Sequence, residues 1–302
     1  MLRSRHLWRI AVQLLFLGVI IAITTYFGSN LSSNLREKGI PFGFDFLTSQ
    51  ASFDIAESLI PFRSSDSYAY ALLVGLLNTL QVSVVGIILA TIVGVFGGIA
   101  RLADNWLIRQ MALVYVEVFR NTPLLLQLFF WYFAVFFNLP TVEAPTQVLG
   151  ILSLSKAGIM LPGNVQLSAE FSALVFGLAL STAAFIAEIV RGSIQAVPIG
   201  QWEAARSLGL KPLQVLRLVI FPQALRIIIP PLTGQYLNLV KNSSLAVAVG
   251  YRDIYSVSAT MENQTGRAVE AMIFIMTVYL TISLAIALVT NWYNQRVQLV
   301  ER

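Results

Sequence analysis

A run of hydrogen-bonding side chains interrupts an otherwise apolar stretch near residue 240. Three amide side chains, spaced at i, i+3 and i+7, share one face of a helix, and they are Gln235, Asn238 and Asn242. Three further polar residues adjoin them, and they are Lys241, Ser243 and Ser244. Amides and hydroxyls can bind a polar solute without the desolvation penalty of fixed charges. The stripe therefore indicates either part of a solute path or polar contacts between helices.

Charged residues occupy two further apolar stretches. Glu117 lies three residues before Arg120 and four before Asn121, so these three share one helix face. Glu188 lies three residues before Arg191. Charges in hydrocarbon are costly and usually face a protein interior or a water-filled path. For each group, local pairing at a helix end and a place along a solute path are both open.

Residues for covalent catalysis are scarce. The 302 residues include no cysteine and one histidine, His6, which lies outside the apolar stretches. These counts exclude disulfides, thiolate metal sites and a cysteine nucleophile, and they argue against a Ser-His-Asp arrangement. The sequence has no G-x-x-x-x-G-K segment and hence no P-loop for ATP. We expect neither a catalytic residue nor a metal site in this chain.

Membrane-spanning helices must position these polar groups. Hydrophobic residues make up 57% of the chain and charged residues 12%, against about 25% charged in a soluble domain. A helix needs about 20 mostly apolar residues to cross a bilayer. Six stretches qualify, and they lie at 10–27, within 69–100, and at about 114–137, 171–190, 227–249 and 271–292. The sequence thus predicts an all-α polytopic membrane protein with six transmembrane helices.

The first stretch is interpreted as a retained anchor, not a signal peptide. Its apolar run is longer than a usual signal core of about 7–15 residues, and Thr24-Thr25-Tyr26-Phe27 is a poor cleavage site. With a cytoplasmic N-terminus, thirteen Lys and Arg residues fall in inside segments and six in outside loops. Basic residues collect on the cytoplasmic side. We therefore expect both termini in the cytoplasm. We attribute the net charge of +5 to the basic residues on the cytoplasmic side of the membrane, not to nucleic-acid binding.

The spans divide the chain into three regions. Residues 1–68 would form the anchor helix with an external segment, residues 69–293 the transmembrane domain, and residues 294–302 a cytoplasmic tail. A second external segment, 138–170, contains several prolines and glycines, which favours a loop with local structure. Glycines in the second stretch favour close helix packing, and they are Gly94, Gly97 and Gly98.

The cytoplasmic segment at about 195–222 predicts a helix–turn–helix elbow. Residues 202–208 are good helix formers, and Gly209 suits a left-handed helix end. Pro212 suits the first turn of a second helix, and Pro222 is expected to break that helix. One apolar face of the second helix would contain Leu213, Leu216 and Ile220. On this pattern alone, a plain interfacial loop is an equally open interpretation.

The elbow resembles the EAA loop of importer-type ABC transporter permeases. This resemblance rests on Glu203-Ala204-Ala205, on Gly209 after three further residues, and on Ile220-Phe221-Pro222. Three more segments are similar to polar amino-acid permeases, and they are residues 115–127, 187–192 and 241–245. Together these matches cover roughly residues 70–293. The N-terminal extension resembles the longer permeases of general L-amino-acid and glutamate/glutamine/aspartate/asparagine uptake systems.

This resemblance implies a type I ABC importer permease fold and a set of partners. The elbow would be a coupling helix that docks on an ATPase subunit. The residues implied in this coupling are Glu203, Ala204, Ala205, Gly209 and Pro222. Two ATPase subunits would bind ATP and Mg, so this chain would hold no cofactor. A second permease chain, in a heterodimer or a homodimer with the heterodimer favoured, and a periplasmic binding protein would complete the complex in the bacterial inner membrane.

The polar residues of the spans are the candidates for the substrate path of such a permease. They are Gln235, Asn238, Lys241, Asn242, Ser243, Ser244, Glu117, Arg120, Asn121, Thr122, Gln127 and Glu188. A zwitterionic amino acid would present a carboxylate and an ammonium to them. An alternative is an ion-gradient-driven secondary amino-acid transporter, which predicts inverted repeats and broken helices. An intramembrane enzyme is the third hypothesis, and the scarcity of catalytic residues argues against it.

Overall fold

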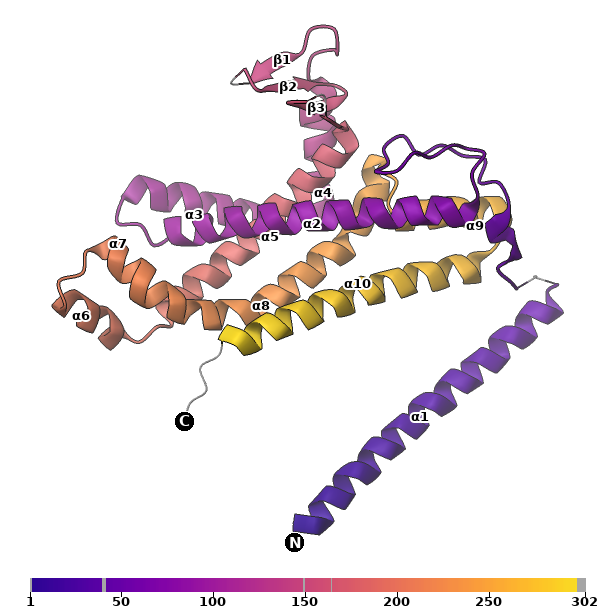
Figure 1. Ribbon diagram of the computed structural model, residues 1–302, viewed down its shortest axis with the longest axis horizontal. Coiled ribbons are helices and arrows are strands. Elements are labelled where there is room, and N and C mark those ends of the chain that lie inside the picture. The colour runs from indigo at the N-terminus through magenta and orange to yellow at the C-terminus, as the bar shows by residue number, and fades with distance from the viewer. Residues whose placement is uncertain (1, 40–41, 149, 164, 298–302) are drawn as a thin grey trace.

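The computed structural model describes residues 2–39, 42–148, 150–163 and 165–297, with the long helices of its body running in broadly similar directions (Figure 1). Residues 298–302 of the predicted tail lie outside this description. Within the described residues, five helical segments are long and apolar enough to cross a membrane. The fold is therefore that of a multi-pass helical membrane protein, as the composition predicts.

Five long helices form the framework. They are α1 (Leu2–Glu37), α2 (Tyr68–Ala100), α5 (Ala169–Gln195), α8 (Phe221–Asn242) and α10 (Ala268–Val297). The short helix α9 (Ile254–Thr265) lies between the end of α8 and the start of α10, after a 3₁₀-helical segment η5 (Ser243–Val249). The ends of these elements are set by polar caps. Ser67 and Ser168, for example, accept hydrogen bonds from backbone N–H groups in the first turns of α2 and α5.

The third of the six predicted spans is not one continuous helix. It is divided into α3 (Trp106–Asn121), α4 (Leu124–Phe129), the π-helical segment η2 (Phe130–Val135) and the 3₁₀ segment η3 (Phe136–Asn138). Pro123 has no N–H to donate, and it forces the preceding residue out of the helical region. Thr122 accordingly has φ −100° and ψ 127°. The break therefore follows from one proline.

The core is built around α5, which packs along α2. Gly94 and Gly98 of α2 allow this approach, as the glycine pattern predicts. A Cβ atom at Gly94 would lie 2.6 Å from Cβ of Ile186, and one at Gly98 would lie 2.6 Å from the carbonyl oxygen of Ala187. Neither helix could come this close with a larger residue at these positions. The α2–α5 pair is consequently the rigid centre of the molecule.

Pro222 does not break the helix, contrary to the sequence prediction. It lies in the first turn of α8, directly after the π-helical segment η4 (Val215–Ile220), and the chain stays helical from Pro212 onwards. A π-helical turn bonds i to i+5 and is wider than an α-turn. The wider turn gives room for a proline that lacks an N–H donor. Pro230 and Pro231 lie further along the same helix.

A small antiparallel sheet forms within the second external segment. Its strands follow one another in the order β1 (Thr146–Val148), β2 (Leu152–Ser155), β3 (Gly158–Leu161) and β4 (Val165–Leu167). The sheet projects from the helical body near the start of α5 (Figure 1). Gly158, opposite Ser155, has a φ of +111° that favours glycine at this turn. The segment is thus a loop with local structure, as expected.

Residues 42–67, which we call the outer cap after the side of the membrane predicted for them, pack against α2, α9 and α10 at one end of the molecule. Ala51 and Ile55 of the cap are buried in one apolar cluster with Val257 and Met261 of α9. The backbone N–H of Gly43 donates to Oε1 of Glu270 over 2.9 Å. The outer cap therefore fixes the chain that follows α1 to the first turn of α10.

Beneath the outer cap, Asp253 is fully buried at the start of α9. Its Oδ1 accepts a hydrogen bond of 2.8 Å from the backbone N–H of Ser256, and its Oδ2 accepts one of 3.1 Å from the hydroxyl of Tyr279. Burial raises the pKa of the Asp253 carboxyl to about 6, and these hydrogen bonds limit the rise. The helix cap thus holds a titratable group out of water.

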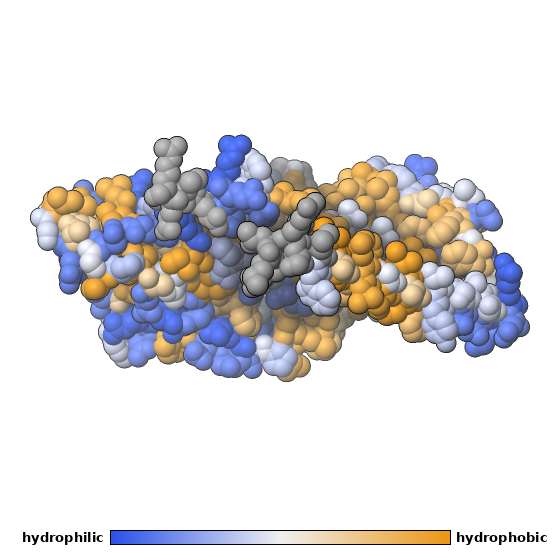
Figure 2. Space-filling view, turned by 90° about the horizontal axis from the view of Figure 1, so that it is seen from below, coloured by the Kyte–Doolittle hydropathy of each residue, from blue (hydrophilic) through white to orange (hydrophobic). Residues whose placement is uncertain are grey.

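Helix α1 stands apart from the other long helices (Figure 1). None of its membrane-length stretch, Ile10–Glu37, is buried. Figure 2 shows the face on which α1 lies. Hydrophobic residues gather over the right half of this face, and hydrophilic residues lie at its right-hand end. Such an exposed apolar helix is stable only in lipid or against another membrane helix.

Candidate functional site

The elbow has the helix–turn–helix geometry that the sequence predicts. Its first helix is α6 (Ile199–Ser207), and its second begins with α7 (Pro212–Gln214) and continues into η4. Gly209 has a φ of +76° and its N–H donates to the carbonyl of Arg206 over 2.9 Å. Pro212 occupies the first turn of α7. The turn is therefore held by one left-handed glycine and one proline.

The predicted coupling residues take different places in the elbow. Ala205 is buried against the helical core, whereas Glu203 and Ala204 are exposed on the surface. Pro222 is also exposed, at the start of α8. The small Ala205 side chain lets α6 lie close to η4 without a gap. The elbow is thus attached to the core on one side and open on the other.

The open side of the elbow is unusually apolar for the surface of a segment that joins two membrane-length helices. The side chains of Leu208, Leu213 and Ile199 are 80%, 74% and 71% exposed. The predicted face of Leu213, Leu216 and Ile220 is wrong in part, because Ile220 is fully buried while Leu213 is not. The π-helical turns between them change the periodicity. Exposed aliphatic side chains grouped in this way are typical of an interaction surface.

The break in the third span is stabilised by its own polar residues. The side-chain amide of buried Gln127 donates to the carbonyls of Phe119 and Thr122, over 2.9 and 2.8 Å. The Phe119 carbonyl lies in the last turn of α3 and would have bonded the N–H that Pro123 lacks, and the Thr122 carbonyl belongs to the extended residue that ends the helix. The Thr122 hydroxyl donates to the carbonyl of Val118 over 2.7 Å. The side chains of Gln127 and Thr122 therefore donate their hydrogen bonds to backbone carbonyls at the break.

Glu117 and Arg120, which share a helix face, do not pair with each other in the structure. The Glu117 carboxylate accepts a hydrogen bond from the Asn121 amide over 3.1 Å. Arg120 instead lies 4.0 Å from Glu188 of α5, and its guanidinium stands over the Phe185 ring, 5.5 Å from the ring centre. Arg120 is consequently part of a second cluster.

This second cluster gathers three arginines around the Glu188 carboxylate. Arg191 donates to both carboxylate oxygens, and Arg101, at the end of α2, donates to Oε2. The local pairing of Glu188 with Arg191 is the interpretation that the spacing of three residues predicts. Arg101, 87 residues away, could not be found from local spacing. The cluster joins α2, α3 and α5 and carries a surplus of positive charge.

The stripe on α8 has a different character. Asn238, Lys241 and Asn242 are exposed, and Gln235 is partly exposed. Among the described residues, no hydrogen bond or ion pair is found for these four side chains. No such contact joins the stripe to the Glu188 cluster either. The polar stripe is therefore open along the surface of a membrane helix.

The two serines beside the stripe are bonded to their own helix. The Ser243 hydroxyl donates to the carbonyl of Val240 over 2.7 Å, and the Ser244 hydroxyl donates to that of Lys241 over 2.9 Å. Ser243 is fully buried. These bonds lie where the α-helix changes to the 3₁₀ segment η5, at the predicted polar break. The serines shape the backbone there and leave the amides as the accessible polar groups.

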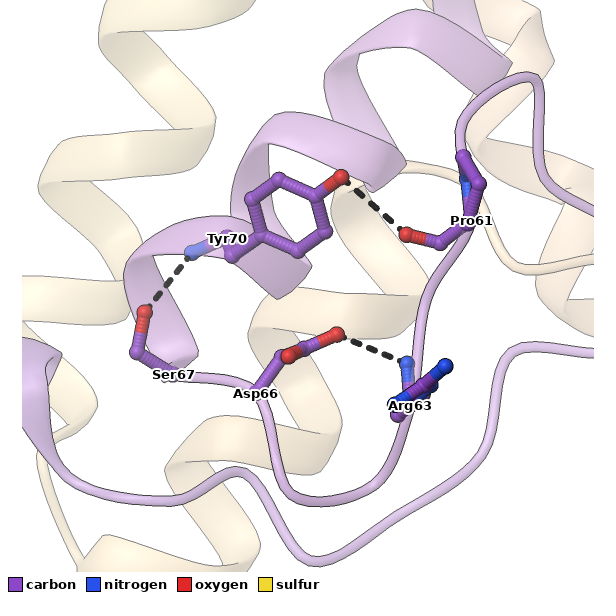
Figure 3. Close-up of a pocket in the computed structure, with 5 residues that line it drawn as sticks. All are labelled: Pro61, Arg63, Asp66, Ser67 and Tyr70. Atoms are coloured by element: carbon purple, nitrogen blue, oxygen red, sulfur yellow. Dashed lines mark hydrogen bonds between the residues drawn. The ribbon is translucent and has the colours of Figure 1, made fainter.

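A pocket of about 440 Å³ opens on the outer cap (Figure 3). The Tyr70 hydroxyl donates to the carbonyl of Pro61 over 3.0 Å, and Oδ2 of Asp66 accepts from the backbone N–H of Arg63 over 2.8 Å. These bonds hold the cap loop against α2. Within the described residues, no group of three or more His, Cys, Asp or Glu side chains could hold a metal ion.

Comparisons with known proteins identify the family. Residues 86–299 match the family described as "Binding-protein-dependent transport system inner membrane component". The chain is 38% identical to the general L-amino acid transport system permease protein AapQ of Rhizobium johnstonii, over 96% of this chain and 92% of that protein. It is 35% identical to the glutamate/glutamine/aspartate/asparagine transport system permease protein BztB of Rhodobacter capsulatus, over 97% and 94%.

A solved structure supports the same assignment. The crystal structure of an amino acid ABC transporter with histidines has a TM-score of 0.60 and 29% identity, over 76% of this chain and 95% of that one. These findings favour an ABC importer permease over an ion-gradient-driven secondary transporter, and they confirm the resemblance to the longer permeases. The chain therefore belongs to the family of inner-membrane components of binding-protein-dependent transport systems, as a permease subunit of an ABC importer.

Proposed function

We propose that this permease subunit carries amino acids across the bacterial inner membrane, with both termini in the cytoplasm. The similarity to two permeases named for amino-acid transport supports this substrate class. We further propose that two separate ATPase subunits bind ATP and Mg and drive the transport, and that a periplasmic binding protein delivers the substrate. The family description, which names binding-protein-dependent transport, supports the latter partner.

The substrate path is proposed to run along the stripe of Gln235, Asn238, Lys241 and Asn242. The observation that carries this proposal is that these side chains are accessible and unpaired within the described residues, although α8 belongs to a membrane-length helix. A lysine and three amides in contact with lipid would lose their hydration without any compensating bond. In the assembled protein the stripe must therefore face water, substrate or another chain.

A second permease chain would enclose the stripe. We propose a heterodimer with a related permease, on the resemblance to the longer permeases of multi-component uptake systems. The stripe of one chain would then form one wall of a path, and the partner would form the other. Glu117, Arg120, Asn121 and Glu188 would lie toward the cytoplasmic part of this path, while Thr122 and Gln127 would hold the broken helix open beside it.

The elbow is proposed to dock on an ATPase subunit through its exposed aliphatic side chains. Burying each of these side chains contributes about 1.5–3 kcal/mol, which offsets part of the free-energy cost of association. The elbow is joined directly to α5 on one side and to α8 on the other. A movement of the elbow is thereby transmitted to the helix with the Glu188 cluster and to the helix with the polar stripe.

The substitution Asn242→Leu tests the path. If Asn242 binds the polar groups of the substrate, the change should lower the effective affinity about tenfold to a hundredfold, since a lost bond to a charged group is worth about 1.5–3 kcal/mol. The assay is uptake of labelled glutamate, glutamine, arginine and leucine by the reconstituted complex, normalised to assembled protein. Asn242→Ser keeps a hydrogen-bonding group and should retain most of the uptake.

The opposite pattern would assign the stripe to helix packing. Asn242→Leu and Asn238→Leu would then lower the yield or the melting temperature of the complex while normalised uptake stayed at the level of the unmodified protein. Basal ATP hydrolysis, measured on the same samples, separates a lost substrate contact from a lost contact with the ATPase.

A further inference from the structure

A cavity of about 470 Å³ lies between the elbow and the turn that joins α2 to α3. The apolar part of its wall includes Leu102 from this turn, Ile194 from α5 and Leu216 from η4. Small-molecule sites typically have volumes of about 300–1,000 Å³ and a mainly apolar lining with a few polar groups. The cavity has both properties. It shares Leu213 with the open side of the elbow, and none of its lining residues belongs to the α8 stripe or to the Glu188 cluster.

Two opposite charges line this cavity without neutralising each other. Asp104 contributes a carboxylate from the α2–α3 turn, and Arg206 contributes a guanidinium from α6. Both side chains are exposed, and within the described part of the chain neither has a hydrogen bond or an ion pair to another residue. Trp202 adds an aromatic surface to the same wall. The cavity therefore offers an anion, a cation and an apolar floor.

A free α-amino acid has the complementary set of groups. We propose that this cavity binds an amino acid from the cytoplasm, with the carboxylate at Arg206 and the ammonium at Asp104. Its side chain lies against Leu102, Ile194 and Leu216. A charged side chain would lose its hydration against this floor, so aliphatic and uncharged amino acids bind best.

A bound amino acid joins the elbow to the α2–α3 turn, because Arg206 and Asp104 belong to these two parts. A ligand that contacts both parts stabilises the arrangement in which both line the cavity, and it disfavours arrangements in which they separate. This regulatory step rests on the proposed function, in which the elbow moves with the ATPase. Amino acid that has accumulated in the cytoplasm thus slows its own import.

The experiment uses the whole complex in vesicles that enclose the binding protein and labelled L-leucine. Mg-ATP is added outside, so only complexes whose ATPase subunits face outward hydrolyse it. Unlabelled L-leucine added outside then reaches only their cytoplasmic face. We expect it to lower both ATP hydrolysis and release of labelled leucine at least fivefold, with saturation. 3-Methylbutylamine lacks the carboxylate and 4-methylpentanoate lacks the ammonium, and each should be at least tenfold less potent.

Two variants locate the effect. Asp104→Asn removes the proposed ammonium partner, and Ala103→Leu fills the cavity that Ala103 lines. Both should raise the half-inhibitory leucine concentration at least tenfold, with normal turnover in the absence of outside leucine. Glu143→Gln, on the exposed outer loop, is the matched control and should behave like the unmodified protein.

Three results would overturn the proposal. The first is ATP-driven release that outside leucine does not slow. The second is inhibition of both variants by the same leucine concentrations that inhibit the unmodified protein, which would place the inhibition in the substrate path. The third is failure of Ala103→Leu to assemble, which would mean that an ATPase side chain fills the cavity. If no labelled leucine is released, the vesicles are loaded with labelled glutamate, glutamine or arginine instead, and the proposed function fails if ATP drives the release of none of the four. The cavity is then judged by binding of tritiated leucine to the purified complex, where Asp104→Asn must weaken binding at least tenfold.

Discussion

Single side chains in this permease compensate for local defects in its helices. Gln127 bonds the two carbonyls that Pro123 leaves without a helical partner, and Asp253 caps the first turn of α9 from a fully buried position. The Gln127 amide is neutral at all pH values, whereas the Asp253 carboxyl can ionise. The stability of the outer end of the molecule should therefore depend on pH, while that of the broken third span should not.

Asp253 gives the first prediction. Burial raises the pKa of its carboxyl from 3.8 to about 6, so the folded protein binds the proton more tightly than the unfolded chain does. The resulting stabilisation is complete below pH 4 and is lost as the pH rises through 6, with a total of about 3 kcal/mol. Asp253→Asn keeps an acceptor for the helix cap and carries no charge. The variant should therefore melt at a higher temperature than the unmodified complex at pH 7.5.

The control for this prediction is the same comparison at pH 4.5, where the two melting temperatures should approach each other. A difference that stays constant between pH 4.5 and 7.5 would show that Asp253 does not titrate in this range.

The residue scale also shows what local sequence cannot reveal. The pairing of Glu188 with Arg191 follows from a spacing of three residues within one helix. Arg101 and Arg120 reach the same carboxylate from α2 and α3, and only the packing of three helices brings them together. The stripe on α8 was predictable because it lies within one helix and repeats with the helical period.

The elements show the same division between local and long-range information. The turn of the elbow was predictable because glycine and proline determine it by their own backbone preferences. The π-helical segments η2 and η4 were not predictable, since no residue type specifies a π-turn. Two errors follow from this, namely the assumption that Pro222 ends a helix and the assignment of Leu213 to the same face as Ile220.

At the scale of the elbow, we predict that Gly209→Val weakens association with the ATPase. The φ of +76° at Gly209 is unfavourable for a β-branched residue, at a cost of about 1 kcal/mol or more. No neighbouring atom would touch the added Cβ, so the effect is on backbone conformation alone. Membrane insertion should be normal, while co-purification of the ATPase and uptake should both decrease.

Asparagine tolerates the left-handed region better than other non-glycine residues, so Gly209→Asn should restore much of the association. Gly200→Ala, within α6, serves as a control because the added methyl group meets open space. Full ATPase association of Gly209→Val would argue against the elbow as the coupling element.

The contact between α2 and α5 gives a further prediction. A Cβ atom at Gly98 would lie 2.6 Å from a backbone carbonyl of α5, which cannot move aside as a flexible side chain could. Gly98→Ala should therefore separate the two helices, with a loss of about 1–3 kcal/mol and a lower melting temperature of the purified complex. Gly192→Ala, on α5 itself, adds its methyl group to open space and should melt like the unmodified protein.

The whole molecule has a predicted orientation that can be measured directly. Because the chain has no cysteine, single cysteines can be introduced without background. The side chain of Val142 is 62% exposed in the second external segment, and Arg217 is exposed in the elbow. A cysteine at position 142 should react with an impermeant thiol reagent in intact cells, and one at position 217 only after permeabilisation. Equal reaction at both positions in intact cells would overturn the orientation.

The overall architecture was predictable where it depends on apolar length and on the distribution of basic residues. The division of the third span follows from Thr122-Pro123, a signal that is present in the sequence but that apolar length alone conceals. The packing of the outer cap on α9 was not predictable, because it joins segments about two hundred residues apart. The domain limits and the site residues inferred from the sequence stay predictions.

The exposed aliphatic side chains of the elbow have a consequence for the life of the protein in the cell. Leu208, Leu213 and Ile199 are exposed in the single chain, and under the proposed docking each newly inserted chain presents this apolar surface until an ATPase subunit covers it. Chaperones and proteases recognise such surfaces, and they remove chains whose exposure persists. The abundance of this chain should therefore follow the supply of its ATPase, because the elbow also marks every copy that has not been assembled.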